Sequence, residues 1–594
     1  MQTLILHSTF IPRNLEITIN SNSSHHHQLT LITAKSSSTI FHNLTKNSST
    51  IFYNLTKKLP KTDQTIINFK SPLPSIFKSL DDFICNVIDL PLPPSLDPKH
   101  VLSGNFAPVS ELPPTACDAV EGSLPGCLDG GAYIRNGPNP HFFPNGPYHL
   151  FEGDGMLHMI KFSHGKPTFC CRYVNTHKHA VEREIGYPFV PSIFSSFNGG
   201  LLASISRFFL TTARVIAGQF DPINHGLGPA NTSLALISDR LFALCESDLP
   251  YAIEITAEGD LKTLGRHDFG LKSAPFSRMT AHPKIDCVTG EAFAYEYVGT
   301  PPSLKLFRID SDGKRQKHVP ISMEKFTAIH DFAVTERYAV IPDVQIVVNP
   351  WSILKGRSPV EIDREKVARL GVIPRYAEDE GEMVWIEAAG FNPVHCASAW
   401  EEDGGDTVCV VASNAMAVDK LLENVGSAEM RMEKIVVDVK RKTVVRRQRL
   451  SPEILDFGVI NPAYAAKKHR YIYAAIVCEL RLIGVVKLDL SIPIKGSGGD
   501  CAVASRWYGP SCHGSEPFFV AREPNNPTAE EDDGYLVTYL HDDNTPQSKF
   551  IVMDAKSPNL DIIAAVKLPQ RIPTGFHGLF LSESDLNKLI RQSC

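Results

Sequence analysis

No long apolar run occurs in this 594-residue sequence. The best candidate covers residues 471–478 and ends at Glu479, whereas a membrane-spanning helix needs about 20 apolar residues. A basic excess is also absent, because 59 Lys and Arg residues face 65 Asp and Glu residues, which gives a net charge of −6. A transmembrane protein is therefore not expected. A nucleic-acid-binding protein is not expected either, because it needs a basic face to neutralise phosphates.

Local cofactor and nucleophile motifs are missing as well. The thirteen Cys residues are scattered and none forms a C-x-x-C pair, so neither a zinc knuckle nor a disulfide framework is predicted. No G-x-G-x-x-G follows a strand pattern, and no P-loop, H-E-x-x-H or G-x-S-x-G occurs. Nucleotide-dependent, zinc-protease and serine-hydrolase chemistry therefore lack their usual sequence support. A reducing compartment is the simplest interpretation of the cysteines.

The N-terminal segment is poor in acidic residues. Glu16 is the only acidic residue in 1–62, while Ser, Thr and Lys are frequent and Arg13 is the only arginine. Scarce acid and many hydroxyl groups are typical of an organelle transit peptide, and scarce arginine favours the chloroplast over the mitochondrion. We predict a chloroplast transit peptide over residues 1–62. An ordinary disordered tail is the alternative.

Residues 63–104 are expected to form a linker with an amphipathic helix. The apolar side chains that share one face of this helix are Ile76, Leu80, Phe83, Ile84 and Val87. A second apolar stretch, predicted to be helical, covers residues 194–215. Such helices usually pack on the core. An interfacial position becomes attractive only if the substrate lies in a membrane.

From about residue 105 to the C-terminus, short strand patterns alternate with turn residues. The clearest strand patterns cover residues 292–298, 332–341, 407–413, 471–477 and 535–540. Asp-Gly and Gly-rich pairs between them are turn signals. Many short strands without a break in composition predict an all-β fold, and a propeller rather than a sandwich. No regular repeat period is evident, so the number of blades does not follow from the pattern.

Several short motifs, in a fixed order, carry a resemblance to a known family. They cover residues 133–140, 151–158, 280–284, 329–332, 392–402, 539–543, 552–555 and 573–578. Together they resemble the carotenoid cleavage oxygenase family over about residues 105–594. Within that family, the sequence is most similar to the plant plastid carotenoid cleavage dioxygenases of the fourth subclass.

The resemblance implies a seven-bladed β-propeller over residues 105–594, capped by a helical dome above an iron site on the axis. It implies one Fe(II) per chain, with O₂ as co-substrate and with the ligands His282, His330, His395 and His577. Composition alone could not select these four among 22 histidines. Imidazole nitrogens suit iron, and open positions beside them admit O₂ and a substrate double bond.

The resemblance also implies carboxylates that orient the histidine rings. By analogy Glu246 supports His330 and Glu516 supports His577, while His282 has no carboxylate partner. The remaining carboxylate is Asp456, where the family pattern E-F-x-x-x-N has Glu. Asp is shorter by one methylene, so a water bridge or a small backbone shift is expected to complete its contact with His395.

Other polar residues near the motifs are expected to be structural. Asp154 and His158 are predicted to hold a turn and a strand rather than to bind metal. His513 and His541 do not match ligand positions. His469 follows two lysines and is expected at the surface.

The resemblance implies a dioxygenase that splits a conjugated C=C bond of a carotenoid or apocarotenoid into two carbonyl products. The 9,10 (9′,10′) bond is the first expectation, with β-ionone-type volatile products, and no protein general base is assigned. The alternatives are 7,8 cleavage, 11,12 cleavage of an epoxycarotenoid, polyene isomerisation, and a propeller that binds carotenoid without turnover. Because such substrates are almost insoluble in water, the expected partner is a plastid lipid surface, either thylakoid or plastoglobule.

Overall fold

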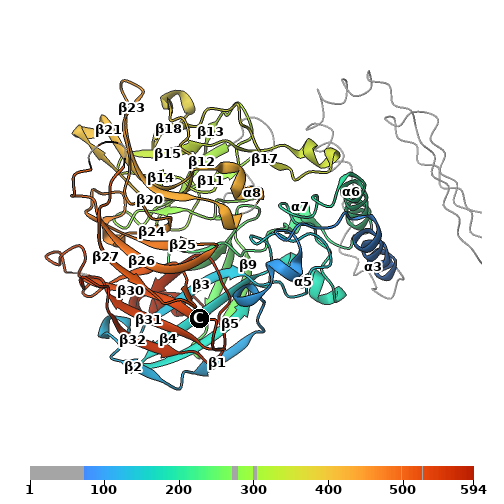
Figure 1. Ribbon diagram of the computed structural model, residues 1–594, viewed down its shortest axis with the longest axis horizontal. Coiled ribbons are helices and arrows are strands. Elements are labelled where there is room, and N and C mark those ends of the chain that lie inside the picture. Colours follow the sequence, from blue (N-terminus) through green and yellow to red (C-terminus); the bar gives the residue numbers. More distant parts are fainter. Residues whose placement is uncertain are drawn as a thin grey trace, which may run out of the picture. The chain divides into compact units, whose positions relative to one another are not determined.

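Antiparallel sheets dominate the computed structural model (Figure 1). It describes residues 73–593, apart from 271–277, 299–303 and the single residues 424, 495, 497 and 525. The predicted transit peptide at 1–62 lies outside the described residues. The predominance of strands confirms the expected β class.

Five sheets hold four or five strands each. The first contains β1 (Leu112–Ala116), β5 (Lys166–Tyr173), β4 (Gly155–Ser163), β3 (Ala132–Pro138) and β33 (Gly578–Leu581). The second contains β6 (Ser233–Ile237), β7 (Arg240–Leu244), β8 (Tyr251–Ile255) and β9 (Leu261–Arg266). The third contains β10 (Lys284–Ile285), β11 (Ala292–Tyr297), β12 (Leu304–Ile309) and β13 (Val319–Ile321). The fourth contains β14 (Ala333–Val334), β15 (Tyr338–Asp343), β18 (Arg369–Pro374) and β19 (Val384–Glu387). The fifth contains β20 (Pro393–Glu402), β21 (Thr407–Ala415), β22 (Met430–Asp438) and β23 (Thr443–Arg449).

A larger sheet of ten strands completes the set. Its first half contains β24 (Leu455–Val459), β25 (Tyr471–Cys478), β26 (Arg481–Asp489) and β27 (Ala502–Trp507). Its second half contains β28 (Cys512–Gly514), β29 (Phe518–Ala521), β30 (Gly534–Asp542), β31 (Ser548–Asp554), β32 (Ile562–Lys567) and β2 (Val120–Gly122). A separate two-stranded sheet pairs β16 (Ile346–Val348) with β17 (Val360–Ile362).

Apolar clusters join the sheets in a circular order. Each of the first four sheets shares a buried cluster with the next, and the fifth shares one with the first half of the ten-stranded sheet. Another cluster joins the two halves of that sheet, and a last one returns to the first sheet through Tyr133 and Phe550. This ring of packed sheets is a propeller-like fold. The count of seven blades stays a prediction, because two of the packed units belong to one continuous sheet.

Burial on both faces explains why many strands read as unbroken apolar runs. In β21, eight successive residues are buried, because one face packs on the fourth sheet and the other on the ten-stranded sheet. Trp400 of the neighbouring strand β20 keeps only 2% of its surface exposed. Burying a large apolar side chain contributes roughly 1.5–3 kcal/mol, so these interfaces are a major source of stability.

Both ends of the described chain take part in closing the ring. The C-terminal strand β33 pairs with β3, so that Arg135 lies opposite Gly578. Near the other end, the second strand, β2, pairs with β32. The first and last parts of the domain therefore hold each other in place.

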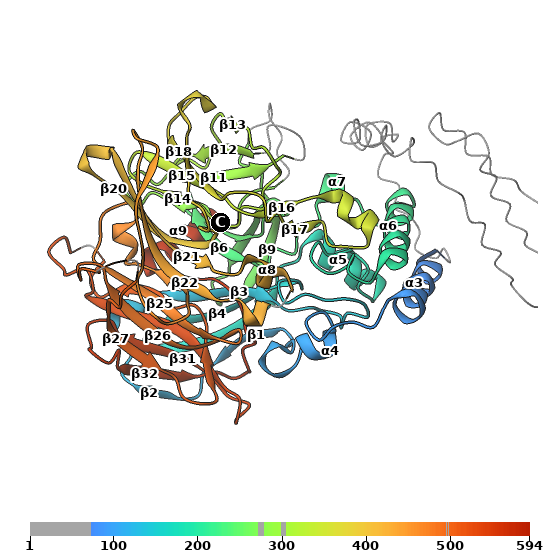
Figure 2. The ribbon, with the colours of Figure 1, turned by 45° about the horizontal axis from the view of Figure 1, so that its top comes forward.

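Helices gather mainly beside one part of the sheets (Figure 2). They are α3 (Leu73–Phe83), α4 (Pro98–Val101), α5 (His177–Ile185), α6 (Leu201–Ile216) and α7 (Pro222–His225), with α8 (Val418–Glu423) and α9 (Glu583–Ser593) elsewhere. The predicted helix over 194–215 begins later than expected, because Gly200 at its N-terminus has φ +96° and interrupts the helical backbone. Of the helices in the described ranges, none combines the length and apolar character that crossing a membrane requires.

Candidate metal centre

Four imidazoles converge from four different sheets. His282, His330 and His577 lie just before the strands β10, β14 and β33, and His395 lies on β20. One side-chain nitrogen from each lies within 4.8 Å of those of the other three. The Nε2 atoms of His282 and His330 are 3.0 Å apart, and those of His330 and His395 are 3.3 Å apart. The structure thus brings together the four histidines predicted as ligands.

Carboxylates hold the rings from behind. His330 Nδ1 lies 2.5 Å from Glu246 Oε1, in the turn that follows β7. His577 Nδ1 lies 2.9 Å from Glu516 Oε1, and the second oxygen of Glu516 accepts the backbone N–H of Gly578 at 2.8 Å. When Nδ1 donates its proton to a carboxylate, the lone pair of Nε2 is left free to face the centre.

Asp456 contacts the ring of His395 directly, although its side chain is shorter than that of Glu. Its Oδ1 accepts from His395 Nδ1 at 2.8 Å, so no water bridge is needed. Strand β24 is irregular between Asp456 and Val459, and Phe457 has a left-handed backbone with φ +53°. The irregular backbone accompanies the direct contact, in line with the expected backbone shift.

Phe457 was not predicted as a site residue. Its ring centroid lies 5.1 Å from that of His395 and 5.4 Å from that of His577. It therefore packs against two of the four imidazoles while its own N–H donates to Asp456 Oδ1 at 2.8 Å. Its position directly after Asp456 was the only signal in the sequence.

Charge and burial set different proton affinities within the cluster. Burial, followed by the neighbouring imidazoles, holds the pKa of His282 well below its usual range. Burial also acts to lower the pKa of His330, but the charge and hydrogen bond of Glu246 outweigh it and the pKa is raised. In the described part of the chain, His330, His395 and His577 each pair with a carboxylate, and no such pair is seen for His282.

The donor set fits a divalent transition metal. Two nitrogens that bind one ion at right angles, each at about 2.1 Å, lie about 3 Å apart, which is close to the observed Nε2 separations. Imidazole suits Fe, Zn, Cu and Ni, so the ligands alone do not select one metal. His330 keeps 34% of its side chain exposed, which leaves one side of the cluster open.

The other polar residues singled out in the sequence lie away from this cluster. Asp154 pairs with Lys178 at 2.8 Å, and His158 is buried on β4 near Arg135. Both are structural, as expected. His513 and His541 face each other across β28 and β30 with ring centroids 5.6 Å apart.

The expectation for His469 was wrong. It is only 6% exposed, its Nε2 lies 3.1 Å from Ser398 Oγ, and its ring meets Trp400 edge-on. The two preceding lysines suggested a surface position. Lys468 and Arg470 on either side of it are exposed, so at this point only the His469 side chain faces inward.

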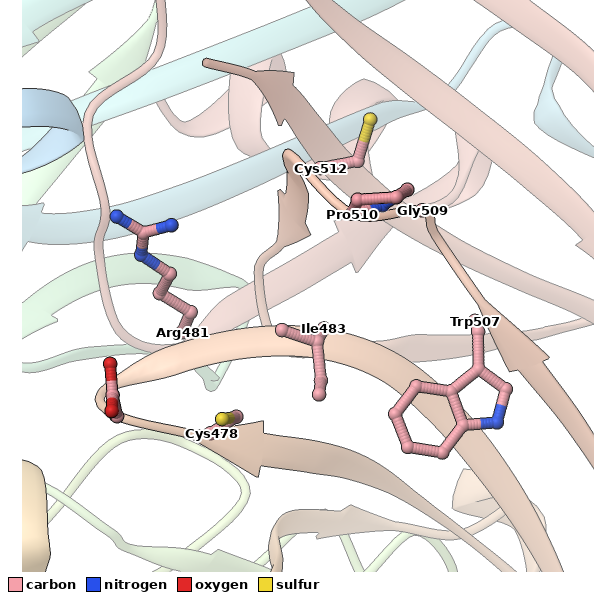
Figure 3. Close-up of a pocket in the computed structure, with 8 residues that line it drawn as sticks. Cys478, Arg481, Ile483, Trp507, Gly509, Pro510 and Cys512 are labelled. Atoms are coloured by element: carbon pink, nitrogen blue, oxygen red, sulfur yellow. The ribbon is translucent and has the colours of Figure 1, made fainter.

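A separate pocket of about 470 Å³ lies at the end of the β25–β26 hairpin (Figure 3). Trp507 and Ile483 form apolar walls, and Arg481 and the thiols of Cys478 and Cys512 lie around them. None of the four converging histidines lines this pocket. It is distinct from the candidate metal centre.

Comparison with known proteins identifies the family. The sequence profile described as retinal pigment epithelial membrane protein (RPE65) matches residues 106–582. The chain belongs to the RPE65/carotenoid cleavage dioxygenase family. The predicted resemblance is therefore confirmed, and the chain is a member of a dioxygenase family that acts on carotenoids or apocarotenoids.

Relatives in this family cover most of the chain. The probable carotenoid cleavage dioxygenase 4, chloroplastic, of Arabidopsis thaliana is 54% identical over 87% of this chain and 86% of its own length. The 9-cis-epoxycarotenoid dioxygenase NCED1, chloroplastic, of Oryza sativa subsp. japonica is 48% identical over 86% of this chain and 81% of its own length. A crystal structure of the cobalt-substituted apocarotenoid oxygenase of Synechocystis is 26% identical with a TM-score of 0.68, and covers 82% of this chain and 99% of that one.

Proposed function

We propose that the chain is an iron(II)-dependent dioxygenase that cleaves one conjugated double bond of a carotenoid or apocarotenoid into two carbonyl products. The observation that carries the proposal is that four imidazoles each place a ring nitrogen within 4.8 Å of those of the other three. The proposed ligands are His282, His330, His395 and His577, with Glu246, Asp456 and Glu516 as their carboxylate partners. Iron(II), when bound, would supply the reactivity toward O₂ that side chains lack.

The protein groups bind and orient in this proposal, and they move no proton. Cleavage of C=C by O₂ places one oxygen atom on each carbon and yields two C=O groups, so the stoichiometry includes no proton. A general base is therefore unnecessary. The neutral imidazoles leave the charge of a metal intact, and the three carboxylates offset it while they fix the rings.

The 9,10 (9′,10′) bond is the proposed position, and β-ionone-type volatiles are the proposed products. The 54% identity with a relative named carotenoid cleavage dioxygenase 4 supports the subclass on which this choice depends. Cleavage of an epoxycarotenoid at 11,12 is the second candidate. The 48% identity with a relative named 9-cis-epoxycarotenoid dioxygenase favours it.

We place the enzyme in plastids, at a lipid surface. Two relatives are named chloroplastic, which supports the compartment. Helices α3 and α6 pack together through a small cluster that includes Phe77 and Leu210. On their outer sides they expose large apolar side chains, which are Leu73, Ile76, Leu80, Phe83, Leu201, Leu202, Phe209 and Ile216, with Val87 and Leu90 just after α3. Ile84 belongs to the predicted stripe but is buried at 5% exposure, so it would not contact lipid.

Product analysis tests the proposal. The full chain and a His330→Ala variant are expressed in bacteria that accumulate carotenoids, and the volatile and polyene products are identified by mass spectrometry. Loss of colour with β-ionone, in the wild type alone, is the expected result. Fragments of another length would identify another bond, an unshortened polyene would indicate isomerisation, and stoichiometric iron without turnover would indicate a binding protein.

A further inference from the structure

One ion pair joins the backbone segments that carry three of the four histidines. Lys284, Asp331 and Cys396 lie two, one and one residues after His282, His330 and His395, respectively. Lys284 Nζ lies 2.7 Å from Asp331 Oδ1. Asp331 Oδ2 accepts the backbone N–H of Cys396 at 2.7 Å, and Lys284 Nζ donates to the carbonyl of Cys396 at 3.4 Å. The third, fourth and fifth sheets therefore meet at this pair.

The segment of His395 depends on this contact more than an ordinary strand residue would. Strand β20 is at the edge of its sheet, and its pairing with β21 shifts register both before His395 and after Cys396. An irregular ladder at an edge fixes a side chain's direction weakly. Asp331 and Lys284 bind both polar backbone groups of Cys396, and so they hold the residue next to His395 from the open side.

The ion pair is also sheltered from water. The side chain of Asp331 is 3% exposed and that of Lys284 is 27% exposed. Asp331 Oδ1 accepts the N–H of Phe332 at 2.7 Å as well, so both carboxylate oxygens have protein donors. A buried carboxylate with protein donors on both oxygens is held in a well-defined position, which suits a residue that sets distances between neighbouring segments.

We propose that Lys284 and Asp331 are positioning residues that set the spacing of His282, His330 and His395 for metal binding. The inference rests on the proposed iron centre and goes beyond it by naming what holds the ligands at their separations. Neither residue was assigned a role from the sequence, although both lie within the motifs at 280–284 and 329–332.

The direction in which metal affinity changes when Lys284 is replaced separates a positioning role from a simple effect of its charge. Lys284 carries a positive charge two residues after His282 in the sequence. That charge therefore opposes any cation at the ring. If Lys284 acted only through its charge, its removal would tighten metal binding. Positioning predicts the opposite, a weaker affinity.

Cobalt(II) is a suitable probe, because a related oxygenase has been solved in cobalt-substituted form. The metal-free full chain is titrated with Co(II), and the absorption bands and the Kd are recorded for the wild type, Lys284→Met and Lys284→Arg. Lys305→Met is the matched control, since Lys305 lies on β12 of the same sheet with 23% side-chain exposure and pairs with Glu296 at 3.8 Å. Far-UV circular dichroism verifies that each variant is folded.

We expect Lys284→Met to raise the Kd by 10–100-fold and to change the cobalt spectrum, with partial rescue by Lys284→Arg and no change in Lys305→Met. A Kd equal to or lower than that of the wild type in folded Lys284→Met overturns the positioning role. If Lys284→Met does not fold, Asp331→Asn decides in the same titration, and a wild-type Kd there overturns it equally. A wild type that binds no cobalt overturns the proposed metal centre itself, which is a separate result.

Discussion

Replacing Asp456 by Asn and by Ala should separate the charge of its carboxylate from the hydrogen bonds that it accepts. Its Oδ1 accepts from both His395 Nδ1 and the backbone N–H of Phe457, each at 2.8 Å. Asn keeps an acceptor oxygen at this position and loses the charge. Ala removes both, and it leaves the imidazole N–H and the backbone N–H without their acceptor.

The expected losses follow from hydrogen-bond energies. A hydrogen bond to a charged group contributes about 1.5–3 kcal/mol, and one between neutral groups about 0.5–1.5 kcal/mol. The midpoints of these ranges differ by about 1.25 kcal/mol, which corresponds to nearly tenfold in affinity. Asp456→Asn should therefore weaken iron binding about tenfold. Asp456→Ala should weaken it by nearly 100-fold, at the upper end of the range for residues that orient metal ligands.

Anaerobic equilibrium dialysis against Fe(II), with metal analysis of the protein fraction, measures these affinities. Asp489→Asn is the control, because Asp489 is also buried, at 4% exposure against 9% for Asp456, but pairs with Arg470 instead of a histidine. Its iron affinity should equal that of the wild type. If both Asp456 variants bind iron as tightly as the wild type, the carboxylate does not support His395, and the reasoning from the 2.8 Å contact is refuted.

Two further expectations concern the ligands and the exposed helices. His330→Ala should lose most of its iron and activity, whereas His513→Ala should keep both; normal iron content in His330→Ala, measured by metal analysis, would contradict the ligand assignment. Phe83→Asp and Leu202→Asp should reduce co-sedimentation with liposomes without changing iron content, because each exposed side chain contributes roughly 1.5–3 kcal/mol when buried in lipid. Wild-type binding should survive high salt, since the attachment is apolar; sedimentation of the variants equal to that of the wild type would assign both helices to ordinary packing.

The propeller-like fold and the four histidines could both be predicted from the sequence, but for different reasons. The segments 407–413 and 471–477 form most of β21 and β25, because near-continuous runs of β-branched, aromatic and small residues suit strands buried on both faces. Short motifs identified the histidines one at a time. Their convergence was supplied by the resemblance, since no local spacing relates His282 to His577.

The details that escaped prediction depend on backbone geometry. The direct reach of Asp456 accompanies a left-handed Phe457, a conformation that its residue type does not announce. His469 was misplaced because exposed neighbours do not determine the direction of the side chain between them: Lys468 and Arg470 are exposed, while His469 faces inward. The sequence does contain a signal for the start of α6, because Gly199 and Gly200 precede it and glycine commonly interrupts a helix.

The pairing of β33 with β3 also determines when the candidate metal centre can form. His577 directly precedes β33, so the fourth imidazole takes its place only when the last strand of the domain has docked. A ribosome-bound chain that ends before this strand carries three of the histidines at most. A metal held by all four can therefore be bound only after β33 has docked on β3, and its binding free energy then opposes reopening of the ring.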